Sequence, residues 1–472
     1  MKAIHYIGCL LAALGCYSCS GYLDIKPYGR TIPKTAEEFS ALIHNHLNNI
    51  DIGNDALLIG NISSTAMWDT GCGDDFENCL TSAAGSTLPI YLGEAAYSVS
   101  RGYDYRDLYA IIRDCNLAIH EMKEDGTEEA NLTRGTAYAL RGTAYYQLMR
   151  LYCEAPEAGK FDSQQGVPLV TSFDMEAKPL RSTLQETIGQ IESDLKEAIA
   201  KAEQTEPSPL FRFTEDVCKG YLARLYFWSE QWGQALPLAQ ELLRSHPLVE
   251  GEAYTHMIAT STELTGNQLI KSYQLMAKDA ASDEQLLLAP LQYRPVSKRL
   301  ISQFPPDERE RDIRYKLWFT AKRINTKPVF CGMRAAEFAL MEAECQYHLG
   351  REAEALKAIN NFRRHRISDY RDLTMDSLPP VPSLEIIRQD ATGKAVTPLL
   401  GLILSERRKE LYLESDRFFE LKRNGTPEYW TAYNGRKYTT QVHMYTFPIP
   451  AKDLLIVDGL KQNPGYTERV SY

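Results

Sequence analysis

The sequence predicts a mainly α-helical protein in which helix hairpins stack into a rigid scaffold. Two observations lead to this prediction. Apolar residues recur at intervals of three and four over most of the chain, which is the spacing of one helix face. Two separate segments also repeat the same helix–turn–helix pattern. Long irregular loops and few short strands complete the predicted fold, and 472 residues are enough to bury a large core.

Individual helices can be placed from their first residues and their apolar stripes. Thr35-Ala36-Glu37-Glu38 is typical of a capping box, so a helix is expected to begin there. Another helix is expected to begin at Ser182 or at Thr183, because both have a Gln or Glu three residues later. The stripes that predict helices are Leu108, Ile112, Cys115, Ile119 and Met122, then Ala137, Leu140, Ala144, Leu148 and Leu151, and then Ile188, Ile191, Leu195 and Ile199.

The repeated pattern occupies residues 221–236 and 338–356. Each segment is predicted to be a helix, a tight turn and a second helix, with alanines where the two helices cross. This pattern resembles the tetratricopeptide hairpin of about 34 residues. One such hairpin cannot bury its apolar face alone, so we expect the hairpins to stack on one another.

Two long stretches, residues 51–100 and 251–330, lack helical periodicity. Long irregular segments are unusual in a compact domain and often carry function. Aromatic rings pair an apolar face with a polar edge, which suits sugar or peptide surfaces. Loops packed on the helical core would explain the aromatic content equally well. The candidate ligand-binding residues in the two stretches are Trp68, Tyr91, Tyr97, Tyr293, Tyr315 and Trp318.

Residues 405–425 form the most highly charged segment with helical spacing. Read as one helix, a single face runs through Leu400, Leu404, Arg407, Leu411 and Glu414. Charges on a core-facing stripe are costly unless they are paired, so the arginine and the glutamate should find partners among themselves or across the core. No nucleophile or metal-ligand set accompanies them, which favours a structural ion-pair lattice over a catalytic site.

The N-terminus is typical of a lipoprotein precursor. A short basic start precedes the apolar run Ile4 to Ala13, which has the length of a signal-peptide core and is too short to span a bilayer. Cys16 and Cys19 both follow small residues at the end of this run. Either cysteine is a candidate for lipid attachment, and a diacylated cysteine suffices for stable anchoring.

The charged segment resembles the C-terminal signature of the SusD/RagB family. The matching residues are Glu406, Arg407, Arg408, Glu410, Leu411, Glu414, Arg417, Leu421, Arg423 and Gly425. Other features with a family resemblance follow in the same order along the chain: Ser18-Cys19-Ser20 with Leu23-Asp24, the helix pairs, Gly166-Val167-Pro168-Leu169, Pro448-Ile449-Pro450 and Asn463-Pro464-Gly465-Tyr466. The match at the start of the chain favours Cys19 as the lipidated residue.

The resemblance implies a division of the chain and a function. Residues 1–18 would be the signal peptide, 19–250 an N-terminal half with tetratricopeptide-like helices, and 251–472 a C-terminal half with a loop-rich insertion and the signature helix. Family members are cell-surface lipoproteins of the outer membrane that capture nutrients for a SusC-like TonB-dependent barrel. The expected ligand is an oligosaccharide, starch-like or another glycan. No family motif transfers ligand-binding residues to this chain.

Two further functions stay open at this point. One branch of the family takes peptides, so peptide or glycopeptide capture by the same architecture is the first alternative. The second is a tetratricopeptide-type scaffold that assembles other envelope proteins. It would explain the helix pairs but not the two aromatic-rich stretches. A glycan-binding assay combined with a glycan-hydrolysis assay separates these possibilities from an enzyme.

Composition and motifs argue against several other classes of protein. The formal net charge of −10 is unfavourable for binding nucleic acid, whose phosphates require a basic surface. The sequence contains no Gly-x-Ser-x-Gly, His-Glu-x-x-His or P-loop motif, so we expect no enzyme and assign no catalytic residue, metal or cofactor. Paired carboxylates, which hydrolyse glycosides, leave one enzymatic possibility open.

The cysteines do not predict a disulfide framework. The precursor has 10 cysteines, and cleavage before Cys19 leaves an odd number besides the lipidated one. Cys72 and Cys79 flank a polar loop, and whether they pair stays open. Cysteines on apolar helical stripes are expected to be buried, namely Cys115, Cys218 and Cys345.

Overall fold

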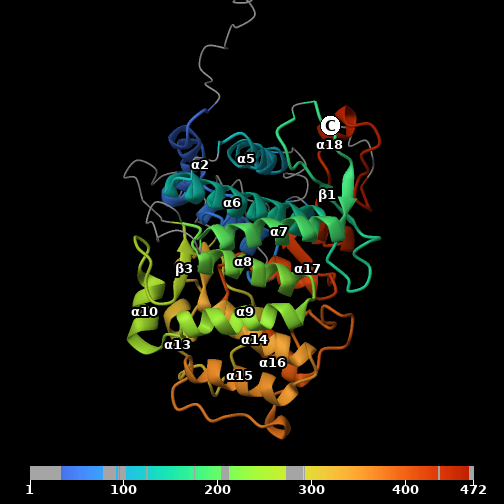
Figure 1. Ribbon diagram of the computed structural model, residues 1–472. Helices are drawn as coiled ribbons and strands as arrows, with labels where there is room; N and C mark the ends of the chain where they lie inside the picture. The colour runs from blue at the N-terminus through green and yellow to red at the C-terminus, as the bar shows by residue number, and fades with distance from the viewer. Residues whose placement is uncertain are drawn as a thin grey trace, which may run out of the picture.

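A stack of α-helices forms the body of the molecule (Figure 1). The computed structural model describes residues 33–77, 92, 93, 95, 103–123, 126–174, 176–202, 212–272, 291, 293–433 and 436–466. The longer helices are α2 (Ala36–Asp51), α3 (Ile62–Gly71), α5 (Tyr103–His120), α6 (Glu128–Tyr152), α7 (Leu184–Ala202), α8 (Glu215–Trp228), α9 (Trp232–Ser245), α10 (Gly251–Ala259), α14 (Ala335–His348), α15 (Glu352–Arg364) and α16 (Pro398–Glu410). Shorter helices are α12 (Lys298–Ile301), α13 (Ile313–Trp318), α17 (Arg417–Arg423) and α18 (Ala451–Ile456), with 3-10 turns η1 (Met375–Ser377) and η2 (Val442–Tyr445).

The helices pack in the order of the chain. Helices α5, α6, α7, α8 and α9 each contact the next, and α9 then packs on α14, which contacts α15 and α16. The two predicted hairpins are α8–α9 and α14–α15, and they stack directly on each other. The predicted fold class is therefore confirmed. The division at residue 250 stays a sequence prediction, and the contact between α9 and α14 runs across it.

The described residues form three small antiparallel sheets, which lie in the connections between helices. They pair β1 (Gln165–Pro168) with β2 (Arg181–Thr183), β3 (Gln268–Lys271) with β4 (Gly332–Arg334), and β5 (Trp430–Tyr433) with β6 (Arg436–Thr439). Gly166, Val167 and Pro168 of the Gly-Val-Pro-Leu segment thus lie in strand β1. A Cβ atom on Gly166 would lie 2.2 Å from Thr187 Oγ1, so only glycine allows the strand to approach α7 this closely.

The helix starts follow from local sequence. Thr35 and Glu38 form the predicted capping box at the start of α2. Of the two starts predicted for α7, the structure has Thr183. Glu186 N donates to Thr183 Oγ1 at 3.1 Å, and Thr183 N donates to the Glu186 carboxylate at 2.8 Å. These bonds satisfy two backbone donors that a helix end otherwise leaves without partners.

The apolar stripes converge on one large core. Leu108, Ile112, Leu140 and Leu195 are completely buried in it, and it continues to Phe418 in α17. A second apolar cluster lies beneath α10 and α13 and includes Tyr254, Trp318 and Tyr412. The helical spacing therefore identified the core-facing residues correctly. Within the described residues, no helix is long and apolar enough to cross a membrane.

The charged segment 405–425 is two helices and not one. Helix α16 ends at Glu410, and Leu413 and Ser415 then have left-handed backbones with φ of 57° and 60°. The turn is held from outside, because Ser415 N donates to Asp69 Oδ2 at 3.1 Å. Glu414 therefore lies in this turn and does not continue the helical stripe. Tertiary contacts override the helical spacing here, since non-glycine residues adopt this conformation only when their surroundings impose it.

Buried carboxylates of α16 bind arginines from elsewhere in the C-terminal half. Glu410 Oε1 lies 2.5 Å from Arg334 Nη1 and 2.9 Å from Arg366 Nη2. Burial disfavours the charge of Glu410, but the charges of these two arginines outweigh burial and hold its pKa well below the usual range. Glu406 is held in the same way by Lys409, Arg314 and Arg363, and the charges of these residues also lower its pKa despite burial.

The two charges singled out on the stripe are also paired. Arg407 Nη2 lies 2.5 Å from Asp416 Oδ1. Glu414 Oε1 lies 2.8 Å from both Lys327 Nζ and Arg334 Nη2. One pair is therefore local and the other reaches across the core. The predicted ion-pair lattice is confirmed.

A second group of ion pairs joins the signature segment to the first irregular stretch. Arg408 and Arg417 both contact Asp74, at 3.1 Å and 2.7 Å. Both arginines also bind Glu385, and their charges lower the pKa of Glu385 despite its burial. Removing one partner of a buried pair leaves a costly unpaired charge. These contacts therefore fix the position of Asp74 relative to α17 and the end of α16.

Candidate functional site

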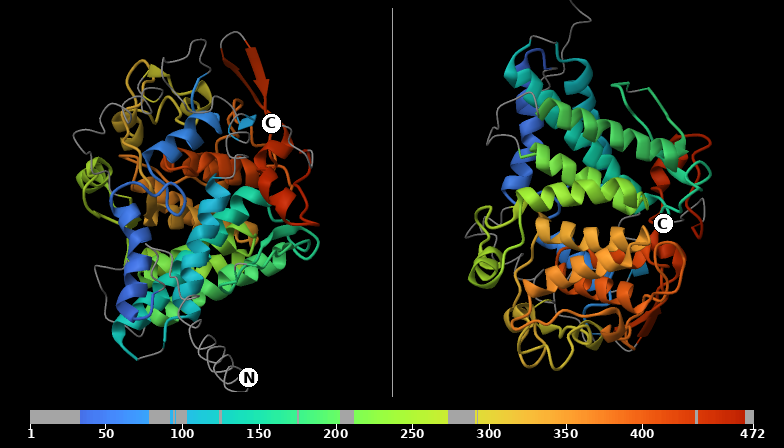
Figure 2. Two further views of the ribbon diagram at one scale, coloured as in Figure 1. Left: turned by 90° about the horizontal axis from the view of Figure 1, so that it is seen from above. Right: turned by 60° about the horizontal axis from the view of Figure 1, so that its bottom comes forward.

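The two irregular stretches of the sequence meet in the fold. Phe76 and Val296 form an antiparallel bridge, and Ser297 Oγ donates to the Asp74 carbonyl at 2.7 Å. Arg294 donates to the Thr70 carbonyl at 2.9 Å. In the left view of Figure 2 the blue N-terminal segment lies beside the yellow segment and the red C-terminal helices. Residues about 220 positions apart in sequence thus build one surface.

The β5–β6 hairpin adds an exposed aromatic ring to this surface. Trp430 is 47% exposed and lines a shallow depression together with Phe76, Arg294 and Arg299. The neighbouring Tyr429 is buried, and its hydroxyl donates to the Cys72 carbonyl at 3.1 Å, which fixes the base of the hairpin. We call this place the junction surface, defined by Phe76, Tyr293, Arg294, Arg299 and Trp430.

The structure separates the six aromatic candidates. Tyr293 is 75% exposed and belongs to the junction surface. Tyr315 is half-buried against Phe304 and Phe319. Trp318 is only 1% exposed. Trp68 is 9% exposed and lines the cavity described below. Tyr91 and Tyr97 lie outside the described residues.

Trp318 is a core residue and not part of a binding surface. Its ring lies 6.3 Å from Tyr412 and 6.4 Å from Phe319, between ring centroids, and Lys327 Nζ lies 5.2 Å from the ring. The short helix α13 turns this side chain inward. For Trp318 the alternative explanation, a loop packed on the helical core, is therefore correct. Trp318 is not included in the candidate functional site. Tyr293 and Trp430 are the aromatic residues that the described surface offers here.

Trp430 was missed by the sequence analysis, although the sequence holds a signal for it. Asn434-Gly435 is the dipeptide typical of a tight β-hairpin, and it lies between two runs containing aromatic and β-branched residues. Aromatic residues on a hairpin that projects from a helical body are commonly exposed, because a two-stranded ribbon has little core of its own to bury them. The hairpin is far from the irregular stretches in sequence, so the sequence alone could not show that they lie close together in the fold.

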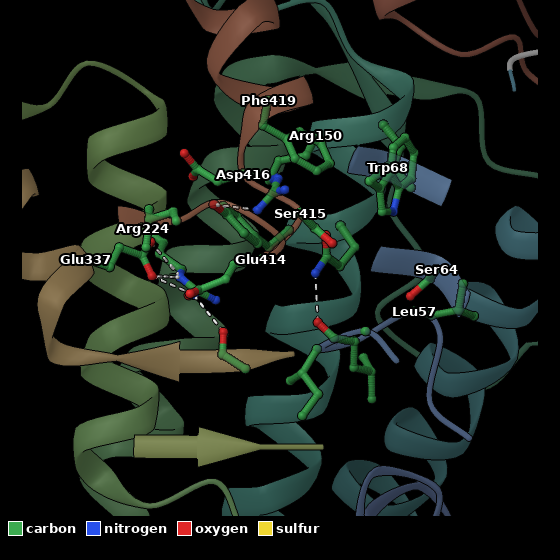
Figure 3. Close-up of a pocket in the computed structure, with 18 of the residues that line it drawn as sticks. Leu57, Ser64, Trp68, Arg150, Arg224, Glu337, Glu414, Ser415, Asp416 and Phe419 are labelled. Atoms are coloured by element: carbon green, nitrogen blue, oxygen red, sulfur yellow. Dashed lines mark hydrogen bonds and ion pairs between the residues drawn. The ribbon is translucent and has the colours of Figure 1, made fainter. Parts of the chain in front are cut away.

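Figure 3 shows a cavity of about 420 Å³ that residues from both halves of the chain line. Helices α6 and α8, the segment around α3 and the turn after α16 enclose it. Its apolar wall includes Leu57, Met67, Trp68, Phe227 and Phe419. Its volume is within the range of small-molecule sites in proteins, which is about 300–1,000 Å³.

Charged residues form the other wall of this cavity, which we call the central cavity. Arg224 Nη2 lies 2.6 Å from Glu337 Oε2, and both side chains are largely buried. Burial disfavours the charge of Glu337, but the charge of Arg224 and its hydrogen bond lower the pKa of the carboxyl. Polar side chains from another direction, among them Asn61 and Ser64, complete the lining. The central cavity is thus half apolar and half charged.

Glu420 differs from the other carboxylates of the central cavity. Burial raises its pKa to about 8, although the charges of Arg423 and Arg407 act in the opposite direction. Its Oε2 atom lies 2.8 Å from Arg407 Nε. Near neutral pH the neutral form of Glu420 is therefore favoured, and the positive charge of the cavity is less fully compensated.

The described cysteines are buried and free, and we assign no chemical role to them. Cys115, Cys218 and Cys345 are completely buried, as predicted. Cys72 is a buried free cysteine, and Cys79 lies outside the described residues. Burial raises the pKa of Cys331 to about 12 despite a hydrogen bond to Thr65, so its thiol is unreactive. Among the described residues no cluster of three histidine, cysteine or acidic side chains is placed to hold a metal ion.

Family models match most of this chain. Residues 21–227 match a model described as starch-binding and associating with the outer membrane. Residues 315–466, which contain the ion-pair lattice and the β5–β6 hairpin, match the model of the SusD family. The chain belongs to the SusD/RagB family.

Solved structures share this SusD-like fold. A SusD superfamily protein from Bacteroides thetaiotaomicron is 17% identical, with a TM-score of 0.66 over 91% of this chain and 100% of that chain. A SusD superfamily protein from Bacteroides vulgatus is 18% identical, with a TM-score of 0.68 over 92% and 100%. A SusD-like carbohydrate binding protein from the same species is 18% identical, with a TM-score of 0.66 over 93% and 100%. At these identities the similarity establishes the fold alone. No curated protein sequence matches this chain significantly.

The SusD/RagB signature residues have a structural role in this chain. Glu406, Arg408, Glu410 and Arg417 are all buried in ion pairs. Their partners come from segments far apart in sequence, so the signature holds together the surfaces on which other residues are displayed. The residues at the junction surface and the central cavity lie mostly outside the signature, which is why the family motif does not identify a ligand.

Proposed function

We propose that this SusD/RagB protein captures oligosaccharides at the cell surface and delivers them to a TonB-dependent transporter of the outer membrane. Family membership supports this proposal, as does the match of residues 21–227 to a family described as starch-binding and associating with the outer membrane. A structurally similar protein is described as carbohydrate binding. The proposal includes binding and transfer of the ligand, with no catalytic step and no cofactor.

One observation carries the proposed binding site. Trp430 is an exposed ring that lines a depression together with Arg294 and Arg299, and Tyr293, the residue before Arg294, is exposed as well. Flat apolar faces of sugar rings stack on aromatic rings, while hydroxyl groups accept hydrogen bonds from arginines. Ion pairs and backbone hydrogen bonds hold the loops of the junction surface in place, so little ordering is required when a ligand binds.

Alanine substitution of the two rings tests this site. We expect Tyr293→Ala and Trp430→Ala to weaken oligosaccharide binding about fivefold each, because one stacking ring contributes roughly 1 kcal/mol. Isothermal titration calorimetry with maltooligosaccharides and a panel of other glycans provides the measurement. Phe173→Ala is the matched control, because Phe173 is an aromatic residue that is 39% exposed and lies outside the junction surface.

The outcome also distinguishes the alternatives. Binding of peptides or glycopeptides in place of glycans, weakened by the same two substitutions, would support peptide capture by this architecture. Unchanged glycan affinity in a correctly folded Tyr293→Ala/Trp430→Ala double variant would remove the junction surface as the binding site. The circular dichroism spectrum of each variant reports whether the helical stack is retained.

The proposed anchor and partner follow from the resemblance to family lipoproteins. Cys19 is proposed as the lipidated residue, and it lies outside the described residues. A capture protein needs a transporter that receives its ligand, and a rigid helical stack offers a broad docking face. A stable contact between the two proteins should bury more than about 1,000 Å².

Purification from native outer membranes tests the anchor and the partner together. With an affinity tag on this chain and gentle detergent extraction, we expect to recover a SusC-like barrel, and an acylated Cys19 in the mass spectrum of the N-terminal peptide. Recovery of the lipoprotein without a barrel, even after chemical crosslinking, would contradict the transport proposal. Recovery of several other envelope proteins in place of the barrel would favour the scaffold alternative.

A further inference from the structure

Among the described residues, five arginines line the central cavity, and four of them have a carboxylate partner. These four pairs are Arg224 with Glu337, Arg334 with Glu414, Arg407 with Asp416 and Arg423 with Glu344. The fifth arginine, Arg150, has no carboxylate partner within the part of the chain that the structure describes. Arg150 is half-buried, and charges that are partly removed from water are normally paired, because an unpaired charge keeps the cost of leaving water.

Arg150 is held in the cavity wall by aromatic rings in place of a carboxylate. The guanidinium carbon lies 3.3 Å from the centroid of the Phe419 ring and 5.2 Å from that of Tyr146. One guanidinium nitrogen donates to the Tyr146 hydroxyl at 3.4 Å, whereas the buried Nε atom has no hydrogen-bond partner. A buried polar atom without a partner in a native fold calls for an explanation, such as an absent ion or ligand.

The backbone beneath Arg150 is also fixed. Arg150 is in the last turn of α6, where its carbonyl accepts a hydrogen bond from Lys422 Nζ at 2.6 Å. Figure 3 shows its side chain among those directed into the cavity, on the same side as Asp416 and Phe419. The guanidinium is thus preorganised, because cation–π contacts and a fixed backbone hold it before any anion arrives.

The rest of the cavity fits a small molecule with both apolar and polar parts. The volume of about 420 Å³ exceeds that of a single anion such as chloride. Leu57 and Met67 supply apolar contact, and Asn61 and Ser64 supply polar groups. Asp104 and Glu420 also line this space, and burial raises the pKa of both carboxyl groups.

We infer that the central cavity binds a small carboxylate-bearing molecule whose carboxylate pairs with the Arg150 guanidinium. Guanidinium and carboxylate groups match each other in a planar, two-bond geometry, which makes arginine the preferred residue for such recognition. Two sources share this chemistry, an acidic sugar and the free carboxylate of an amino acid or short peptide. The inference does not rest on oligosaccharide capture at the junction surface, which is a different place.

Matched pairs of probes test the inference on the full processed chain. D-Galacturonate and D-galactose differ in the carboxylate at the sixth carbon, and N-acetylalanine represents a peptide carboxylate. We expect titration calorimetry to show binding of D-galacturonate or N-acetylalanine, with D-galactose at least tenfold weaker. The stronger of the two acids identifies the source of the carboxylate. Higher salt should weaken binding, because an ion pair is screened.

Substitutions of Arg150 connect the binding to the cavity. Arg150→Gln is expected to weaken binding of the preferred acid at least tenfold, and Arg150→Lys by a smaller factor, because lysine keeps the charge but loses the planar fork. Arg364→Gln is the control, since it removes an exposed arginine of α15 that does not line the cavity. Thermal melting of each variant reports whether the fold is intact.

Three results would overturn the inference. They are an absence of binding by both acids, binding of D-galacturonate and D-galactose with equal affinity while N-acetylalanine does not bind, and unchanged binding of the preferred acid in a folded Arg150→Gln variant. If Arg150→Gln does not fold, the acid affinity of Arg150→Lys compared with that of the wild-type chain still tests whether the planar guanidinium group is required. Acid binding that is at least tenfold weaker in Arg150→Gln, less weakened in Arg150→Lys and unchanged in Arg364→Gln supports the inference.

Discussion

Replacing Glu410 with alanine is expected to lower the free energy of unfolding by about 3–5 kcal/mol. The Glu410 carboxylate is completely buried and contacts Arg334, Arg366 and Arg314. Removing it leaves these guanidiniums short of negative charge in the interior, where water cannot replace the lost partner. The cost arises from the remaining unpaired cations more than from the loss of attraction within the pair.

Urea unfolding followed by circular dichroism measures this effect. Asp372→Ala is the matched control, because Asp372 pairs with Arg364 on the surface, where about half of each side chain is exposed. Exposed pairs contribute about 0–1 kcal/mol, so the control should unfold almost like the wild-type chain. Equal, small effects of Glu410→Ala and Asp372→Ala would show that water reaches the lattice and that it does not hold the fold together.

Much of the helical stack could be predicted from the sequence because its forces are local or periodic. The stripe that includes Leu108 and Ile112 identified a buried helix face, and the spacing of Thr183 and Glu186 offered a correct helix start. The ion-pair lattice was predictable as well, since a charge such as Arg407 on a core-facing stripe requires a partner. Spacing alone could not name that partner.

The break after Glu410 could not be predicted, because distant residues impose it. Helical periodicity continues through Leu411 and Glu414, yet the left-handed turn depends on contacts such as Ser415 N with Asp69, 346 residues earlier in the sequence. Nothing in the local sequence encodes such a contact. The same limit applies to every residue whose conformation is decided by a remote partner.

The candidate site was predictable in its segments but not in its residues. The aromatic content marked residues 51–100 and 251–330, and their described parts do meet at the junction surface. Whether a ring is exposed depends on neighbouring elements, so Trp318 is buried while Tyr293 is exposed. The sequence did not mark Arg150 as a candidate binding residue, because an arginine at a helix end is normally solvated. Only the fold shows that this arginine lacks a carboxylate partner among the described residues.

Acidification from about pH 4.5 to pH 2 is expected to destabilise the protein, and Glu344 should account for roughly 3 kcal/mol of this loss. Burial opposes ionisation of Glu344, but the charge of Arg423 and the hydrogen bond that Arg423 donates lower its pKa from 4.5 to about 2. Because the folded-state pKa is below the unfolded one, the stabilisation is complete above pH 4.5 and disappears as the pH falls through 2. Glu406 and Glu410, whose pKa values are also lowered, act in the same direction.

The variant Glu344→Gln isolates the contribution of this one carboxyl group. It should be less stable than the wild-type chain at pH 6, and the difference in free energy of unfolding should shrink toward zero as the pH approaches 2. In the surface control Asp372→Asn, the difference from the wild-type chain should stay small at every pH, because Asp372 is half exposed. Urea midpoints measured at half-unit pH steps give both curves. A Glu344→Gln difference that is the same at pH 6 and pH 2 would mean that Glu344 is not ionised in the folded protein. In that case the pairing of Glu344 with Arg423 would not stabilise the fold through charge.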